Sequence, residues 1–131
     1  MDFKYSEPLR PDCKLSDFLG MVVSIKAVGR EFKTTVPATA NRPGFVSDAV
    51  LAMIVGFNPT NGQVKVGHTN LFPPGLRQEA LRVQPTFTKP GLLAKIPVTD
   101  PDKAAAGYTT WTTQPVTDAI LAAANAAFLA Y

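Results

Sequence analysis

GMVVSIKAVGREFK, residues 20–33, has the clearest periodicity in the chain. Met21, Val23 and Ile25 fall on one parity and Ser24 and Lys26 on the other, which is the two-residue period of a strand with one buried and one exposed face. Gly29 then interrupts the alternation, as a residue at a bulge or a sharp bend does. The pattern predicts a long first strand that bends at a glycine and continues through residues 30–33.

Two cations and an aromatic ring follow the predicted bend, at Arg30, Lys33 and Phe32. A curled β-barrel whose first strand carries cations on its open face is suited to gripping a polyanion. An ordinary edge strand with solvated lysines is the alternative interpretation of the same residues.

The chain has 131 residues, a length that favours one domain with a substantial core. Its composition, 46% hydrophobic and 18% charged, is that of a globular protein. No apolar run approaches the roughly 20 residues that a membrane span needs, and the first residues lack the apolar core of a signal peptide. We therefore expect a soluble cytoplasmic protein, with residues 1–16 as an extended N-terminal arm and residues 17–131 as one domain.

The residue types in the chain give little support for an enzymatic function. Cys13 is the only cysteine and His68 the only histidine, which excludes a disulfide within the chain and a zinc site of several thiolates. No phosphate-binding Gly-x-x-x-x-Gly-Lys motif occurs. Asp100 and Asp102 have a spacing that can hold a metal, but a helix cap is the more common role for such a pair. We expect a protein that is not an enzyme and binds no metal or cofactor.

Positive charge is concentrated in the middle of the chain. Residues 18–99 carry a net charge of +6, whereas residues 1–17 carry −1 and residues 100–131 carry −2. A basic centre with mildly acidic ends is typical of proteins that bind polyanions, although proteins that bind no nucleic acid also have it.

The remaining elements follow from hydrophobic period and turn residues. Further strands are predicted at residues 47–57, 63–71 and 91–98, a single turn at 15–19, and a short connecting helix at 76–83. Loops are predicted at 34–45, 85–90 and 99–114. Residues 47–57 are apolar on both parities, so a buried helix is the competing interpretation there. Gly67 lies within a predicted strand, where it permits the close approach of a backbone or a ligand.

A C-terminal helix is predicted from Pro115 onward, because proline suits a first helical turn and Asp118 lies near the positive end of the helix dipole. Its alanine-rich sequence allows close packing. The helix is therefore expected either to dock on the rest of the chain or to meet a second copy in a homo-oligomer.

Four segments, in this order, resemble the OB-fold-type single-stranded DNA-binding proteins of actinobacterial bacteriophages. They are LSDFLGMVVSIKAVGREFKT, SDAVLAMIVGF, VKVGHTNLFPPGLRQEALR and GLLAKIPVTDPDKA, and together they span residues 15–103. The resemblance implies a mainly β fold, a small OB-like curled β-barrel, and binding of single-stranded DNA with little sequence preference in phage DNA replication or recombination. Three features depart from the family. The family has a more acidic middle stretch, and it has a proline-tryptophan pair before its last strand, whereas Trp111 follows that strand here. The C-terminal helix beyond Pro115 is additional.

Single-stranded DNA requires cations for its phosphates and aromatic faces for its unstacked bases. The candidate nucleic-acid-binding residues are Lys26, Arg30, Phe32, Lys33, Lys65, Arg77, Arg82 and Trp111. A phenylalanine at a strand end is also a common core residue, and Trp111 is either a contact or a lid over the barrel end. The alternative function is that of a phage virion or assembly protein, which would use its basic face and its alanine-rich helix for protein–protein contacts.

Overall fold

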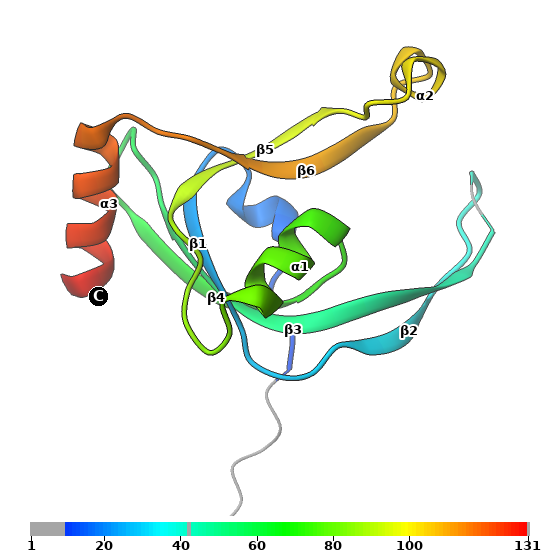
Figure 1. The fold of residues 1–131 in the computed structure, drawn as a ribbon, viewed down its shortest axis with the longest axis horizontal. Helices are drawn as coiled ribbons and strands as arrows, with labels where there is room; N and C mark the ends of the chain where they lie inside the picture. Colours follow the sequence, from blue (N-terminus) through cyan, green and yellow to red (C-terminus); the bar gives the residue numbers. More distant parts are fainter. Residues whose placement is uncertain (1–9, 42, 131) are drawn as a thin grey trace, which may run out of the picture.

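The computed structural model describes residues 10–41 and 43–130 and is mainly β (Figure 1). Its six strands form one antiparallel sheet: β1 (Val22–Ala27), β2 (Phe32–Val36), β3 (Phe45–Phe57), β4 (Val64–Leu71), β5 (Gly91–Pro97) and β6 (Thr109–Gln114). The helices are the 3₁₀ turn η1 (Leu15–Phe18) and the α-helices α1 (Pro74–Arg82), α2 (Pro101–Ala105) and α3 (Asp118–Ala130).

The long strand β3 organises the sheet. One of its edges pairs first with β2 and then with β1, in registers that set Phe45 opposite Val36 and Phe57 opposite Val22. Its other edge pairs with β4. The predicted strand at residues 20–33 is therefore two strands on the same edge of β3. The interruption at Gly29 is confirmed, but a corner separates the two strands where a continuous bent strand was expected.

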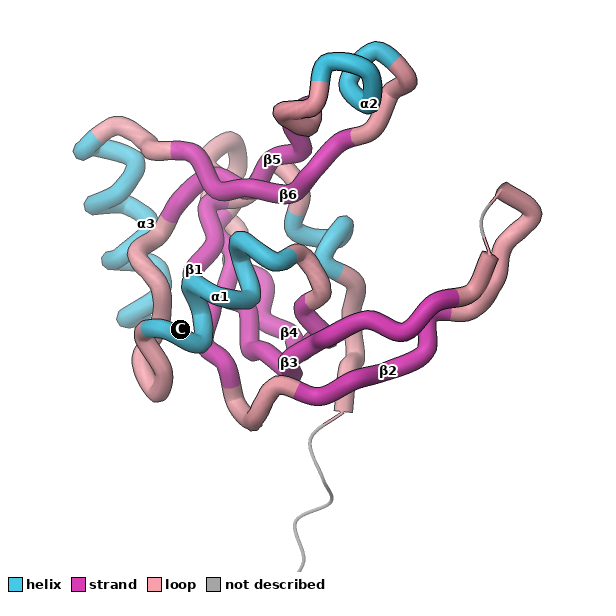
Figure 2. Tube along the Cα trace, turned by 45° about the vertical axis from the view of Figure 1, so that its right-hand side comes forward, coloured by secondary structure: helices cyan, strands magenta, loops and turns pink. Residues whose placement is uncertain are grey.

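The closed OB-like barrel that the sequence predicts is not confirmed. β5 joins β1 only at the start of both strands, through Val22 and Val23, and pairs along its length with β6. Within the described residues β4 and β6 do not pair, so the sheet stays open between these two edges. Figures 1 and 2 show the β2–β3 and β5–β6 hairpins extending from the same side of the molecule.

The main core lies on one face of the sheet, which we call the inner face. Alternate residues of β1 and β3 point there and are fully buried, Ile25 opposite Ile54 among them, because a strand turns successive side chains to opposite faces. α1 adds Leu76 and Ala80, and η1 adds Phe18. The predicted short helix and the predicted turn at residues 15–19 are both confirmed, since each supplies apolar side chains to this core.

A second apolar cluster forms on the opposite, outer face, where α3 docks on one end of the sheet. Ala124, fully buried, contacts Val22 and Phe57, and Phe128 packs against the same cluster. The side of α3 that carries Ala124 and Phe128 thus docks on the sheet of the same chain. The helix begins at Asp118, after Pro115, because the Thr117 side-chain oxygen accepts a hydrogen bond from the Ile120 N–H at 3.3 Å.

The loop expected at residues 99–114 instead contains α2 and β6. Asp100 is a helix cap, as the sequence indicated, and its side chain accepts hydrogen bonds from the backbone N–H groups of Asp102 and Lys103. β6 was missed because its sequence TTWTTQ has no apolar alternation: threonine fills both faces. Its pairing with β5 is a tertiary property.

Predicted strands at 47–57, 63–71 and 91–98 are confirmed as β3, β4 and β5, with shifts at their ends, so the helical alternative for residues 47–57 is wrong. Of the predicted arm, residues 1–9 lie outside the described residues. Asp12 and Cys13 lie along the free edge of β4, where their N–H groups donate to the His68 carbonyl oxygen at 2.9 and 3.2 Å. Among the described helices, none has the length and apolar character needed to cross a membrane.

Candidate nucleic-acid interface

The strand registers divide the candidate residues between the two faces of the sheet. Lys26 lies opposite Met53, which lies opposite His68, so these three side chains form one row across β1, β3 and β4. Phe32 lies opposite Ala49, four residues from Met53 on β3, which places its side chain on the same outer face. We call the partly exposed residues of this face the outer patch: Lys26, Phe32, Leu51, Met53, Val55, Val66, His68 and Asn70.

An aromatic side chain that the sequence had left in a loop borders this patch. Thr88 runs beside β1, where its N–H donates to the Ile25 carbonyl oxygen at 2.8 Å and its side-chain oxygen accepts from the Ile25 N–H at 3.0 Å. The preceding residue, Phe87, is 38% exposed, and the Lys26 Nζ lies 5.2 Å from the centroid of its ring. Sequence reasoning missed Phe87 because hydrogen bonds distant in sequence fix its position.

The corner between β1 and β2 supplies the other end of the patch. Phe32 is 39% exposed, and Arg30, two residues before it, is exposed to solvent. The Gln84 side chain donates to the Gly29 carbonyl oxygen at 3.0 Å, which holds the corner against the segment that leads to Phe87. Lys26, Arg30, Phe32 and Phe87 are thus brought onto one side of the molecule.

No carboxylate belongs to the outer patch, but Asp12 borders it at His68. Asp12 Oδ2 lies 4.0 Å from His68 Nδ1, and Asp12 Oδ1 accepts a hydrogen bond from the His68 N–H at 2.8 Å. This backbone hydrogen bond is the main cause of the lowered pKa of Asp12. The patch therefore combines partly exposed aromatic and apolar side chains with Lys26, and the acid that borders it at His68 is held by a backbone donor.

Two other candidates lie on the inner side, where they form ion pairs. Lys33 faces Asp48 across β2 and β3, with Nζ 2.8 Å from Oδ1, and this pair raises the pKa of Lys33. Arg77 is 8% exposed, and its guanidinium donates to Glu31 Oε2 and to the carbonyl oxygens of Asp48 and Phe72. Arg77 therefore joins three segments of the fold through its Nε and Nη1 donors.

Lys65 and Arg82 are also apart from the outer patch. Lys65 lies opposite Gly56 on the inner face, with its Nζ 5.5 Å from the centroid of the Phe18 ring. Arg82 is on the exposed side of α1 and its Nε donates to Glu79 Oε2 at 3.2 Å. The structure thus brings together three of the eight predicted residues and distributes the other five.

Trp111 is the fifth of these, and it lies at the open seam of the sheet. Its ring packs against the main core, and the Lys95 Nζ lies 4.6 Å from the ring centroid, because the two residues are opposite one another on β5 and β6. A pocket of about 730 Å³ opens beside it, between β6, the end of β4 and the segment before η1. Its lining includes Lys14, Lys95, Asn70, Phe72 and Thr109, and no carboxylate.

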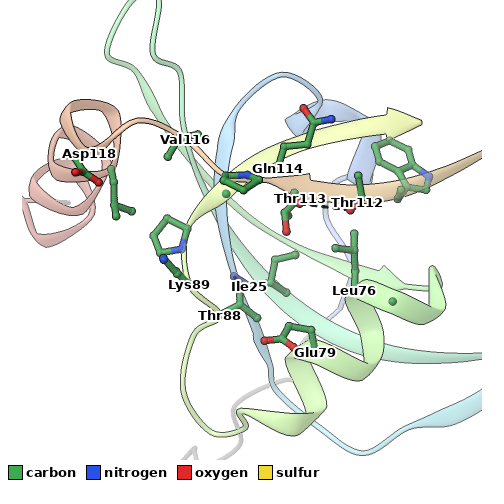
Figure 3. A pocket seen from close by; sticks show the side chains of 16 residues that line it. Ile25, Leu76, Glu79, Thr88, Lys89, Thr112, Thr113, Gln114, Val116 and Asp118 are labelled. Atoms are coloured by element: carbon green, nitrogen blue, oxygen red, sulfur yellow. Dashed lines mark hydrogen bonds between the residues drawn. The ribbon is translucent and has the colours of Figure 1, made fainter. Parts of the chain in front are cut away.

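A second pocket, of about 470 Å³, lies at the other end of β6 (Figure 3). Leu76 and Glu79 of α1 form one wall, and Thr112 and Thr113 of β6 form the opposite wall, with Ile25 and Thr88 between them. Trp111 lines both pockets, so together they follow β6 along its length.

The described residues contain no cluster of side chains that could hold a metal ion, and neither pocket contains an arrangement for nucleophilic catalysis. The outer face carries exposed aromatic rings beside a lysine, Phe87 with Lys26 among them. Comparison with known proteins identifies no relative: the chain matches no family model, no curated protein and no solved structure.

Proposed function

We propose that the protein binds single-stranded DNA without strict sequence preference, through the outer patch together with Arg30 and Phe87. The observation that carries the proposal is the position of the Lys26 ammonium 5.2 Å from the partly exposed ring of Phe87, on a sheet face that has no carboxylate. A stacked base on such a ring contributes about 1–3 kcal/mol, and an adjacent cation neutralises the phosphate.

The geometry favours single strands over a duplex. Phe32 and Phe87 are ring-bearing side chains at the two sides of the patch, and bases can reach such rings only when they are unpaired. The resemblance to phage single-stranded DNA-binding proteins supports the same function, with binding in the host cytoplasm during replication or recombination.

The test is a titration of fluorescein-labelled oligothymidine, followed by anisotropy over a range of salt concentrations. Changing Lys26 and Arg30 together to Ala should make the slope of log affinity against log salt shallower by about 1.4, since each phosphate contact to a single strand contributes about 0.7. Replacing Phe87 by Ala should cost about 1–3 kcal/mol of binding free energy with little change in slope.

The matched control is the double replacement of Lys33 and Lys65 by Ala. It removes the same number of positive charges from the inner face, so the salt slope should stay close to that of the unchanged protein. An equal loss of slope in both double variants would show that only net charge matters. Absence of binding at low salt, where the electrostatic contribution is largest, would disprove the DNA-binding proposal.

A role in protein–protein assembly is the second candidate, because the outward side of α3 is uncharged. Beyond Asp118 the helix has no ionisable side chain, and Leu129 is 90% exposed. If α3 mediates a homo-oligomer, Leu129→Lys should lower the mass seen by light scattering without changing the circular dichroism. An unchanged mass would leave DNA binding as the function to test.

A further inference from the structure

We propose that the free edge of β6 binds an extended acidic segment of a partner protein as an added strand. This surface shares only Asn70, which lines the larger pocket, with the outer patch, and its partner is a polypeptide. The proposal rests on the direction of the backbone groups of β6, on the pockets beside them and on the charge of the pocket lining.

The pairing of β5 with β6 determines which backbone groups of β6 are free. The Val98 N–H donates to the Tyr108 carbonyl oxygen at 3.3 Å, so this pair is a hydrogen-bonded one in the antiparallel ladder. Hydrogen-bonded and non-hydrogen-bonded pairs alternate in such a ladder. Pro97 with Thr109 and Lys95 with Trp111 are therefore non-hydrogen-bonded pairs. The N–H and C=O groups of Thr109 and Trp111 consequently point away from β5.

Nothing in the described part of the chain satisfies these groups. No described residue donates to or accepts from the backbone of Thr109 or Trp111 on that side, and β6 is the last strand of the sheet in this direction. Unpaired strand edges are templates for another strand, and proteins usually protect them with charge, proline or a bulge. The sequence TTWTTQ has none of these three protections.

Space for an added strand lies beside the same groups. The pocket of about 730 Å³ is lined by Thr109, Thr110 and Trp111, and the pocket of about 470 Å³ by Trp111 and the residues after it. An extended peptide can therefore follow β6 from one pocket to the other, with alternate side chains directed to the inner side of the sheet.

Charge determines the chemistry of the partner. Two lysines, Lys14 and Lys95, line the larger pocket, and no carboxylate does. Glu79 and Asp118 line only the smaller pocket. A peptide strand with acidic side chains near Trp111 therefore meets opposite charge, which favours an acidic segment over a basic one.

The experiment uses the full chain and peptides of about eight residues, a typical strand length, in which valine alternates with glutamate. Trp111 is the only tryptophan, so its fluorescence reports occupancy of this edge directly. The acidic peptide should change the emission of Trp111 saturably, and a peptide with lysine in place of glutamate should bind at least tenfold more weakly.

Two changes test the backbone contacts. Thr109→Pro removes an N–H group from the free edge without removing a hydrogen bond between β5 and β6, and it should weaken binding of the acidic peptide about fivefold. Thr109→Val retains the N–H group and should not weaken binding. A peptide N-methylated at alternate residues should bind the unchanged protein weakly, which keeps the test valid if Thr109→Pro fails to fold. Equal binding of the methylated peptide, or no response of Trp111 to any peptide, overturns the proposal. Displacement of the acidic peptide by oligothymidine from Trp111 would also overturn it and assign this edge to nucleic acid.

Discussion

Arg77 and Glu31 form an ion pair that connects α1 to the corner between β1 and β2. The Arg77 Nε donates to Glu31 Oε2 at 2.7 Å, and the same guanidinium reaches the carbonyl oxygens of Asp48, at 3.1 Å, and Phe72. Glu31 and Asp48, both distant from Arg77 in sequence, thus meet at one side chain that is 8% exposed. The pair positions the corner that carries Arg30 and Phe32, although neither Arg77 nor Glu31 faces the outer patch.

Removing this side chain should destabilise the fold. We expect Arg77→Met to lower the free energy of unfolding by about 2–3 kcal/mol, because it removes the guanidinium donors from Glu31 and from the part-buried carbonyl oxygens of Asp48 and Phe72. Arg82→Met is the matched control, since Arg82 pairs with Glu79 on the exposed side of the same helix and should change stability little. Urea denaturation followed by circular dichroism measures both. Similar midpoints for the two variants would contradict a structural role for Arg77.

The close approach of the N-terminal segment to β4 depends on Gly67. A Cβ atom at this position would lie 2.5 Å from Cys13 Sγ, so Gly67→Ala should displace Cys13 from the edge of β4. Burial is the main cause of the raised pKa of the Cys13 thiol, and displacement should lower that pKa and speed reaction with a disulfide reagent at pH 8. Gly29→Ala is the control, because a Cβ there meets no atom within 4 Å. Unchanged thiol reactivity in Gly67→Ala would show that the segment is not held there.

Acid should weaken the fold through two carboxylates. The pKa of Asp12 is lowered mainly by the hydrogen bond from the His68 N–H, and the pKa of Asp48 is lowered mainly by the hydrogen bond from Lys33. A depressed folded-state pKa contributes stability that is present above the unfolded value, about 3.9, and is lost as the pH falls through the folded value.

Melting temperatures measured between about pH 2 and pH 6 should therefore fall below about pH 4. Asp12→Asn retains an oxygen that can accept from the His68 N–H but does not titrate, so its melting temperature should depend less steeply on pH in this window. Parallel curves for the variant and the unchanged protein would show that Asp12 makes no such contribution.

Packing of α3 on the sheet should be sensitive to volume at Ala124. This residue is fully buried against Val22 and Phe57, and Ala124→Leu should cost about 1–3 kcal/mol of stability through overpacking. The neighbouring Ala123 is exposed, so Ala123→Leu controls for the effect of leucine on the helix itself. Thermal unfolding compares the two. Equal stability would mean that α3 is free to shift on the outer face.

Local sequence determined most elements of this fold. Alternation identified the strands around Ile25 and Val66, a glycine marked the break between β1 and β2, and the apolar, β-branched run at residues 47–57 proved to be the central strand. These signals are local because the alternation of apolar and polar side chains, and the backbone conformations open to glycine, can be recognised in a short stretch without the rest of the chain. The helix N-cap at Asp100 could be predicted from the sequence for the same reason.

Tertiary structure alone decided which residues come together in the candidate site. Lys26, Arg30 and Phe32 were predicted from one stretch and remain on one side, but Phe87 joins them only because Thr88 is hydrogen-bonded to β1 from 63 positions away. Arg77 and Lys33 looked equivalent to Lys26 as cations, yet long-range ion pairs occupy them. β6 has no hydrophobic period of its own, so its existence and its free edge depend on pairing with β5. The number of charged and aromatic residues follows directly from the sequence. Strand register and contacts between distant segments decide which of these side chains share a face of the sheet.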